Sequence, residues 1–115
     1  MKNNTIYFNP SCTKCNQTLS LLNEKEIPAD IIEYLGSPPS IEELTHIISL
    51  GIPAKDLVRT HEDEWKESRL DINSASDEEI MNTIIANPII LQRPIVIANG
   101  KAVIGRPPEK VLEIL

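Results

Sequence analysis

The chain holds its only two cysteines in one short segment, Asn9-Pro10-Ser11-Cys12-Thr13-Lys14-Cys15. A run with β-branched and aromatic side chains, Thr5–Phe8, leads into this segment, and an apolar run with helical spacing, Thr18–Leu22, leads out of it. The Cys-x-x-Cys pair is therefore predicted at a strand-to-helix junction. Free backbone N–H groups and the positive end of the helix dipole favour a thiolate at such a junction. This position predicts a redox site at a helix N-terminus.

The spacing of the two cysteines predicts their roles. With Cys12 at the helix start and Cys15 one turn further on, the two sulfurs lie on the same side of the helix, so a disulfide is possible. Cys12 is then the nucleophile and Cys15 the resolving thiol. Two ordinary reduced core cysteines are an alternative, and so is a zinc site, although His46 and His61 do not match a zinc-finger spacing. A phosphatase loop would have an arginine six residues after the nucleophile, and Thr18 occupies that position.

Size and composition indicate one globular domain spanning residues 1–115. Of the 115 residues, 41% are hydrophobic and 24% are charged, which is close to the average for soluble domains. No apolar run approaches the roughly 20 residues of a membrane span, and no secretion signal is visible, so we expect a cytoplasmic protein. In that compartment a close cysteine pair is more often catalytic, redox-sensing or metal-binding than structural. The net charge of -6 gives no indication of nucleic-acid binding.

The sequence pattern of the first third of the chain predicts a strand, a helix and a second strand. Thr5–Phe8 is the first strand, and a helix is expected from about Cys12 to Glu24, with Asn9 or Ser11 as its cap. The helix residues expected on or near the buried side are Leu19 and Leu22, followed by Ile27. Asp30–Leu35 reads as a second strand, parallel to the first because such crossovers are right-handed β-α-β units.

A helical insertion is expected from about residue 40 to residue 87. Ser40–Glu43 has the pattern of a capping box, and the helix that it begins should end at Gly51. The mixed, highly charged pattern of residues 52–69 predicts short helical turns rather than one long element. Ser76–Glu79 is a second capping box, which predicts a third helix that ends before Pro88.

A hairpin and a last helix are expected after the insertion. Pro94–Ala98 and Lys101–Ile104 flank Asn99-Gly100, the dipeptide most favoured in a tight type I′ hairpin. These two strands should therefore be antiparallel neighbours. Pro107-Pro108 can begin a helix. Its inward residues are expected to be Val111, Leu112 and Leu115.

The element order is therefore β-α-β, the helical insertion, then β-β-α. This order predicts an α/β, thioredoxin-like fold with a four-stranded mixed sheet, in spatial order two, one, three, four. In such folds a Cys-x-x-Cys after the first strand carries the redox chemistry.

Four arginines are present, at positions 59, 69, 93 and 106. Arg93 directly precedes Pro94 and Arg106 directly precedes Pro107, and the Arg93-Pro94 bond, before the third strand, is a candidate for the cis form. In the predicted layout the loop before the third strand lies beside the start of the first helix. Planar guanidinium groups hold tetrahedral oxyanions well, while a solvated surface charge is the ordinary alternative for any single arginine.

Several dispersed motifs run from about Thr5 to Leu115 and cover nearly the whole chain. They are Ile6–Cys12, Tyr34–Pro39, Leu57–Arg59, Asn87–Val96 and Gly105–Pro107. In sequence and in order these stretches resemble the glutaredoxin-coupled arsenate reductase family and its relatives. The resemblance implies a thioredoxin-like fold with a helical insertion, as the element order does.

The resemblance also implies a reaction and roles for individual residues. Cys12 would attack arsenate and form a thiol-arsenate adduct, and Arg59, Arg93 and Arg106 would hold the oxyanion. Glutathione would attack the adduct, glutaredoxin would remove the glutathione, and arsenite would leave. No metal and no bound cofactor are implied, and we expect a monomer that does not bind nucleic acid or membranes.

Two positions differ from the usual pattern of that family. Characterised members usually carry histidine where this chain has Phe8, and a residue other than cysteine where it has Cys15. Cys15 predicts that the protein resolves its own intermediate as a Cys12–Cys15 disulfide, with thioredoxin or glutaredoxin as electron source. Cys15 also resembles the Cys-x-x-Cys switch of the related Spx-type regulators, which bind RNA polymerase. A redox-switched regulator of that type, or a general disulfide or glutathione-mixed-disulfide reductase, is therefore the alternative function.

Overall fold

The computed structural model describes residues 4–115 of the chain. Its internal contacts divide the chain into two compact units. One unit combines the two ends of the chain, Met1–Ser37 and Arg93–Leu115, and the other is the continuous segment Pro38–Gln92. The expected single domain over residues 1–115 stays a prediction.

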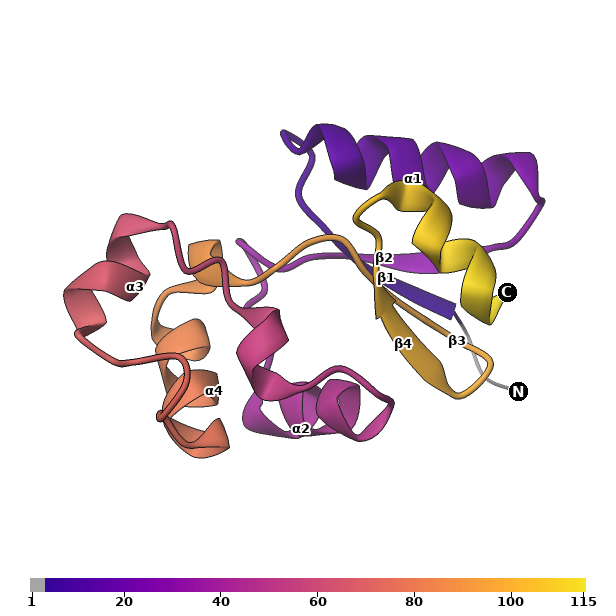
Figure 1. The fold of residues 1–115 in the computed structure, drawn as a ribbon. Helices are drawn as coiled ribbons and strands as arrows, with labels where there is room; N and C mark the ends of the chain where they lie inside the picture. Colours follow the sequence, from indigo (N-terminus) through magenta and orange to yellow (C-terminus); the bar gives the residue numbers. More distant parts are fainter. Residues whose placement is uncertain (1–3) are drawn as a thin grey trace. The chain divides into compact units, whose positions relative to one another are not determined.

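A four-stranded mixed sheet forms the centre of the first unit (Figure 1). Its strands are β1 (Asn4–Phe8), β2 (Ala29–Glu33), β3 (Ile95–Ala98) and β4 (Lys101–Ile104). The spatial order β2-β1-β3-β4 confirms the predicted order, and β1 and β2 are parallel as predicted. The second strand ends two residues earlier than expected, because the N–H groups of Gly36 and Ser37 turn back to the carbonyl oxygen of Glu33 at 3.1 Å.

The predicted hairpin joins β3 to β4. Ala98 pairs with Lys101, and the two residues between them, Asn99 and Gly100, have φ angles of 54° and 74°. A type I′ turn has positive φ at both central residues, which asparagine and glycine tolerate best. The Asn99 side chain also donates a hydrogen bond of 2.7 Å to the carbonyl oxygen of Ile114, so the turn holds the end of the chain.

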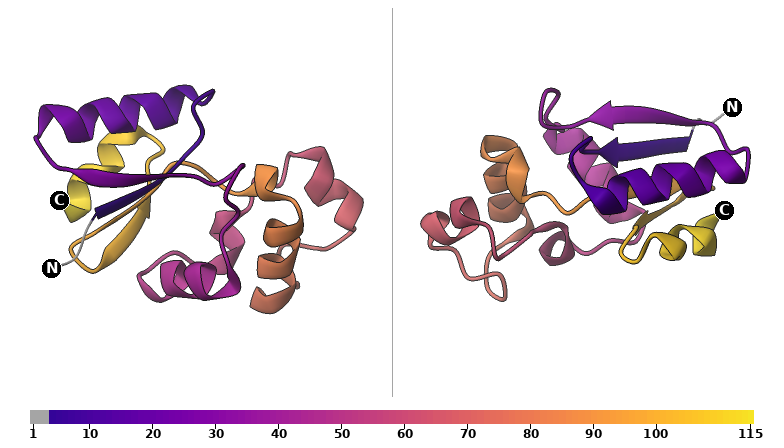
Figure 2. Two further views of the ribbon diagram at one scale, coloured as in Figure 1. Left: turned by 180° about the vertical axis from the view of Figure 1, so that it is seen from behind. Right: turned by 90° about the horizontal axis from the view of Figure 1, so that it is seen from above.

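Two helices lie side by side on one face of this sheet in all the views (Figure 1, Figure 2). They are α1 (Thr13–Glu24) and η3 (Pro108–Ile114). Their apolar side chains meet those of the sheet in one buried core, because alternate strand residues point to the same face. Its members are Ile6, Phe8, Cys15, Leu22, Val96, Ala98, Val111 and Ile114, with Leu19 and Ile27 packed against it.

The last helix corrects one of the sequence predictions. It is a 3-10 helix, in which three residues make a turn and every third side chain falls on the same side. Pro108, Val111 and Ile114 are therefore buried. The prediction that Leu112 and Leu115 point inward was wrong, since they are 42% and 36% exposed, respectively. That prediction assumed the 3.6-residue period of an α-helix.

The second unit contains the predicted helices of the insertion. They are α2 (Ile41–Ser49), η1 (Ala54–Leu57), α3 (Asp63–Ser68), α4 (Asp77–Ala86) and η2 (Pro88–Ile90). Both predicted capping boxes are present: the side chains of Ser40 and Ser76 each accept a hydrogen bond from the N–H of the glutamate three residues later, at 3.1 Å. The expected short turns of residues 52–69 are η1 and α3.

A close contact in the first unit connects α1 to the segment that follows β4. A Cβ atom built on Gly105 would lie 2.9 Å from Thr18 Oγ1 and 2.9 Å from Pro94 Cγ. Cβ atoms almost never come this close to other heavy atoms, and both neighbours are buried. Glycine at this position therefore lets the chain after β4 approach the helix that carries the cysteines.

We expect the substitution Gly105→Ala to destabilise the protein by about 1–3 kcal/mol, because the added methyl group overpacks a closed contact. The free energy of unfolding from urea denaturation measures the effect. Gly36→Ala is the matched control, since a Cβ there would meet only the carbonyl oxygen of Glu33 at 3.8 Å, an ordinary contact. Equal free energies of unfolding for Gly105→Ala and Gly36→Ala would contradict the close approach.

Candidate active site

The turn between β1 and α1 fixes the position of both cysteines. The carbonyl oxygen of Asn9 accepts a hydrogen bond from the N–H of Cys12 at 2.9 Å, and its side-chain oxygen accepts one from the N–H of Ser11 at 3.0 Å. The N–H of Asn9 itself points at the Cys15 sulfur, 3.5 Å away. The buried Asn9 thus contacts Ser11, Cys12 and Cys15 and fixes the segment that carries the cysteines.

The predicted cap of α1 was wrong. Neither Asn9 nor Ser11 caps the helix: the N-cap residue is Cys12, and no side-chain oxygen accepts a hydrogen bond from the first turn there. The N–H groups of that turn are therefore not occupied by a capping oxygen. They are available to the cap residue's own sulfur and to an anion bound next to it.

The surroundings of the Cys12 sulfur favour its thiolate. Partial burial of Cys12 raises its pKa, but hydrogen bonds from the backbone N–H and the thiol of Cys15 lower it. A hydrogen bond from the Arg93 side chain and one from the backbone N–H of Lys14 lower the pKa further, so that the net value lies below that of an ordinary cysteine. Cys12 is partly exposed and is therefore accessible to a substrate.

Two of the three arginines expected to bind an oxyanion lie at this sulfur. Arg106 donates one hydrogen bond from Nε to the carbonyl oxygen of Arg93 at 2.7 Å and one from Nη2 to Cys12 Sγ at 3.5 Å. The Arg93 side chain, which is 8% exposed, also contacts Cys12. The Arg93-Pro94 bond, named as a cis candidate, is cis, and so is Arg106-Pro107. The structure thus brings Cys12, Arg93 and Arg106 together within one unit.

Cys15 has a different environment from Cys12. Its side chain is fully buried in the core beside Phe8. Burial raises the pKa of the Cys15 thiol to about 12, although the N–H of Asn9 partly opposes this effect. Cys15 is therefore protonated at neutral pH when both cysteines are reduced, while Cys12 is the stronger thiolate former.

Arg59, the third predicted oxyanion ligand, belongs to the unit Pro38–Gln92. Its backbone N–H donates to the carbonyl oxygen of Ile90 at 2.7 Å, beside the bridge between Val58 and Leu91. Its guanidinium lies 3.2 Å from a carboxylate oxygen of Glu62 and 3.1 Å from the ring of His61. The role of Arg59 toward the cysteines stays a prediction.

Sequence reasoning missed two contributors to the site. Asn16 donates from its side-chain amide to the carbonyl oxygens of Pro10 at 2.9 Å and Cys12 at 3.1 Å, so it holds the segment between the strand and the helix. Gly105 allows the close approach of the segment that carries Arg106. An asparagine one residue after a Cys-x-x-Cys and a glycine before an arginine are too common to have been recognised in advance.

Within residues 4–115, no helix is long and apolar enough to span a membrane. Over the same residues, no three side chains of the types that bind metals, namely histidine, cysteine, aspartate and glutamate, lie close enough together to hold a metal ion.

The contacts at the Cys12 sulfur predict how fast it reacts with iodoacetamide at different pH values. We expect half-maximal alkylation at a pH below that of the urea-unfolded protein, because the thiolate reacts and its pKa is lowered in the fold. Arg93→Gln should raise this midpoint, since it removes a hydrogen bond to the sulfur. Mass spectrometry identifies the modified cysteine.

Arg69→Gln is the control for that experiment, since Arg69 is an exposed residue at the end of α3. An unchanged alkylation midpoint in Arg93→Gln, or an equal rise in both variants, would show that Arg93 does not stabilise the Cys12 thiolate.

Comparisons with known proteins show the family of this chain. The model of the ArsC family matches residues 7–114. An arsenate reductase from Neisseria meningitidis is 40% identical over 96% of this chain and 96% of its own length, and an uncharacterised Escherichia coli protein is 44% identical over 96% and 94%. A solved structure of an arsenate reductase from Vibrio cholerae is 40% identical, covers 98% of both chains and superposes with a TM-score of 0.92. The sheet, the cysteine at the start of α1 and these likenesses together show that the chain belongs to the ArsC family, with a thioredoxin-like fold.

Proposed function

We propose that this protein reduces arsenate to arsenite through a covalent adduct on Cys12. The observation that carries the proposal is the Cys12 sulfur, which lies at the start of α1 with the side chains of Arg93 and Arg106 in contact with it. A thiolate beside guanidinium groups is suited to attack an oxyanion whose charge those groups neutralise. The relatives named arsenate reductase support arsenate as the substrate.

In the first step the Cys12 thiolate attacks arsenic. A sulfur–arsenic bond forms and one arsenic–oxygen bond breaks, and the departing oxygen leaves as water after it takes up protons. Arsenic remains in the +5 state, so no electrons have yet been transferred. Arginine is suited to this step because its planar fork can hold two oxygens of the anion at once.

In the second step Cys15 resolves the adduct. Its sulfur attacks Cys12 Sγ, a disulfide forms, and the electron pair of the sulfur–arsenic bond stays on arsenic, which leaves as arsenite in the +3 state. Two thiols are thereby oxidised and one arsenic atom is reduced by two electrons. The thiol proton of Cys15 must be removed first, and the N–H of Asn9 at 3.5 Å stabilises the thiolate so formed.

A donor outside this chain then returns the disulfide to two thiols. We propose glutathione with glutaredoxin, or thioredoxin, as this electron source. The cycle uses no bound cofactor, and it belongs in a reducing compartment such as the cytoplasm.

The two cysteines make separable contributions to this cycle. Cys12→Ser should abolish arsenate reduction, because no adduct can form. Cys15→Ser should abolish turnover supported by thioredoxin alone but retain turnover with glutathione and glutaredoxin, since an external thiol can attack the adduct. Arsenate-dependent NADPH oxidation, coupled separately to each donor system, measures both effects. Arsenate reduction by Cys12→Ser at the parent rate would exclude the proposed nucleophile.

The proposed oxyanion clamp consists of Arg59, Arg93 and Arg106. Arg106→Lys keeps the charge but loses the fork that contacts both Cys12 and the carbonyl oxygen of Arg93. We expect the KM for arsenate to rise about tenfold in this variant and in Arg59→Gln, a change in binding of roughly 1.4 kcal/mol. Steady-state kinetics with varied arsenate measures it, with Arg69→Gln as the control. If Arg59→Gln had the same KM for arsenate as the parent protein, Arg59 would not belong to the oxyanion clamp.

A further inference from the structure

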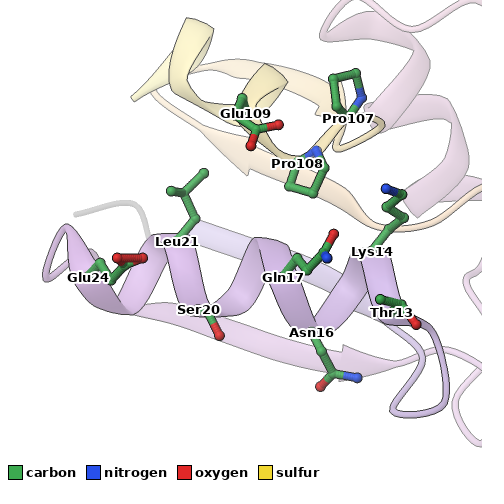
Figure 3. Close-up of a pocket in the computed structure, with 10 residues that line it drawn as sticks. All are labelled: Thr13, Lys14, Asn16, Gln17, Ser20, Leu21, Glu24, Pro107, Pro108 and Glu109. Atoms are coloured by element: carbon green, nitrogen blue, oxygen red, sulfur yellow. The ribbon is translucent and has the colours of Figure 1, made fainter.

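The arginines of the proposed oxyanion clamp are held by different kinds of group. In the first unit, Arg106 contacts the Cys12 sulfur, and the residue that follows each of them in the chain lines a groove along α1 (Figure 3). That contact is made within the proposed active site itself. In the second unit, Arg59 contacts two side chains that have no assigned role in the reaction, His61 and Glu62. These two side chains are therefore the groups that can control how Arg59 is presented to an anion.

The backbone of Arg59 is fixed by a short turn. The N–H of Glu62 donates to the carbonyl oxygen of Arg59 at 3.1 Å, which closes a four-residue turn directly before α3. The N–H of Arg59 donates to the carbonyl oxygen of Ile90, the last residue of η2, at 2.7 Å. Both backbone polar groups of Arg59 are thus hydrogen-bonded, so the orientation of its side chain depends on the groups that touch the guanidinium.

Two side chains of the same turn touch that guanidinium. Its Nε lies 3.2 Å from a carboxylate oxygen of Glu62, and its Nη2 lies 3.1 Å from Nε2 of His61. The side chains of Arg59 and Glu62 are only 15% and 24% exposed, so this ion pair is partly shielded from water. In a planar guanidinium the N–H of Nε and one N–H of Nη2 lie on the same edge. Glu62 and His61 therefore fix the plane of the group from one edge.

The contact with Arg59 determines the form of the His61 ring. A guanidinium has five N–H donors and no acceptor, so the ring nitrogen 3.1 Å from it accepts the hydrogen bond. An imidazole nitrogen accepts only when it carries no proton, whereas both nitrogens of the charged ring are donors. His61 therefore holds Arg59 as a neutral ring whose proton is on Nδ1.

Protonation of His61 would reverse this contact. The charged ring would present an N–H donor and a positive charge to a cation 3.1 Å away, and it would compete with Arg59 for the carboxylate of Glu62. Histidine is the side chain whose charge ordinarily changes between about pH 5 and 8. The contact is thus made on the alkaline side of the titration of His61 and lost on the acid side.

The other charged groups around this turn come from α3. The segment Pro88–Gln92, to which Arg59 is bonded through Ile90, contains no titratable side chain. The charged side chains of α3 are Asp63, Glu64, Lys66 and Glu67. All of them are retained when only His61 is replaced, so a comparison of the parent with a His61 variant at one pH isolates the charge of the ring.

We propose that His61, in its neutral form, is a positioning residue that holds the Arg59 guanidinium for oxyanion binding, together with Glu62. The inference rests on the proposed function, in which Arg59 is one of three arginines that bind arsenate. It predicts that the affinity for arsenate falls when His61 takes up a proton. A His61 that bound the anion directly would have the opposite effect, because a charged ring attracts an anion.

Steady-state kinetics between about pH 5.5 and about pH 8 test the proposal. Glutamine keeps an uncharged acceptor at every pH, so we expect the KM of the parent for arsenate, divided by that of His61→Gln, to be close to one at high pH and about threefold higher at low pH. The titrations of arsenate and of Cys12 cancel in this quotient. His61→Ala removes the acceptor and should raise the KM about threefold at high pH.

His46→Gln is the matched control, since His46 is the other histidine of the chain and is exposed on α2. Its KM should follow that of the parent at every pH. A quotient for His61→Gln that does not change with pH, or that falls toward low pH, would overturn the proposal.

The NMR signals of the imidazole nitrogens separate this proposal from the proposed function. At high pH they should show the proton of His61 on Nδ1 in the parent, and Arg59→Met, which removes the donor, should shift the proton toward Nε2. A parent that reduces no arsenate would contradict the proposed function, and the ring signals would still decide whether His61 holds Arg59. A proton on Nε2 of His61 in the parent would overturn the proposal.

Discussion

The site depends on the turn that Asn9 makes between β1 and α1. Its carbonyl oxygen and its side-chain oxygen accept hydrogen bonds from Cys12 and Ser11, and its own N–H is directed at Cys15. Because Asn9 is buried, these bonds are made where water does not compete for them. Both sulfurs are thus positioned by the residue that directly follows β1, a strand paired on both sides. Cys12 is thus held close to the end of a central strand of the sheet.

The same helix turn gives its two cysteines opposite properties. Cys12 is partly exposed and receives hydrogen bonds from backbone N–H groups and from Arg93, all of which favour the thiolate. Cys15 lies one turn further into the core beside Phe8, where burial raises the pKa of its thiol to about 12. Of the two side chains, only Cys12 is accessible and favoured as a thiolate, while Cys15 is a buried, protonated thiol. An imidazole at the position of Phe8 would disturb this apolar surrounding, so Phe8 and Cys15 are consistent with one another.

Much of the fold follows from local patterns in the sequence. The Asn99-Gly100 turn, the two capping boxes and the β-branched and aromatic run of Thr5–Phe8 are short-range signals, and each predicted its element. The errors have a physical cause as well. The prediction that Leu112 and Leu115 are buried assumed an α-helical period, whereas the last helix is a 3-10 helix with a period of three. Asn9 or Ser11 was expected to cap α1, but the side-chain oxygen of Asn9 accepts a hydrogen bond from the N–H of Ser11, in the turn before the helix.

The site was less predictable than the fold because its members come from distant parts of the chain. Position alone suggested that Arg93 lies near the first helix, but the contact of Arg106 with Cys12 depends on the close approach at Gly105. No local pattern encodes that approach. The role of Arg59, which lies in the helical unit, follows only from the family resemblance.

In the proposed cycle the electrons for arsenate reduction come from Cys12 and Cys15 themselves. The most direct measurement incubates the fully reduced protein with arsenate and no other reductant, and counts arsenite formed and free thiols lost. We expect about one arsenite per chain, together with the loss of both thiols as an intramolecular disulfide. Arsenite formation with both thiols retained, or no arsenite above the level seen with thiol-blocked protein, would contradict it.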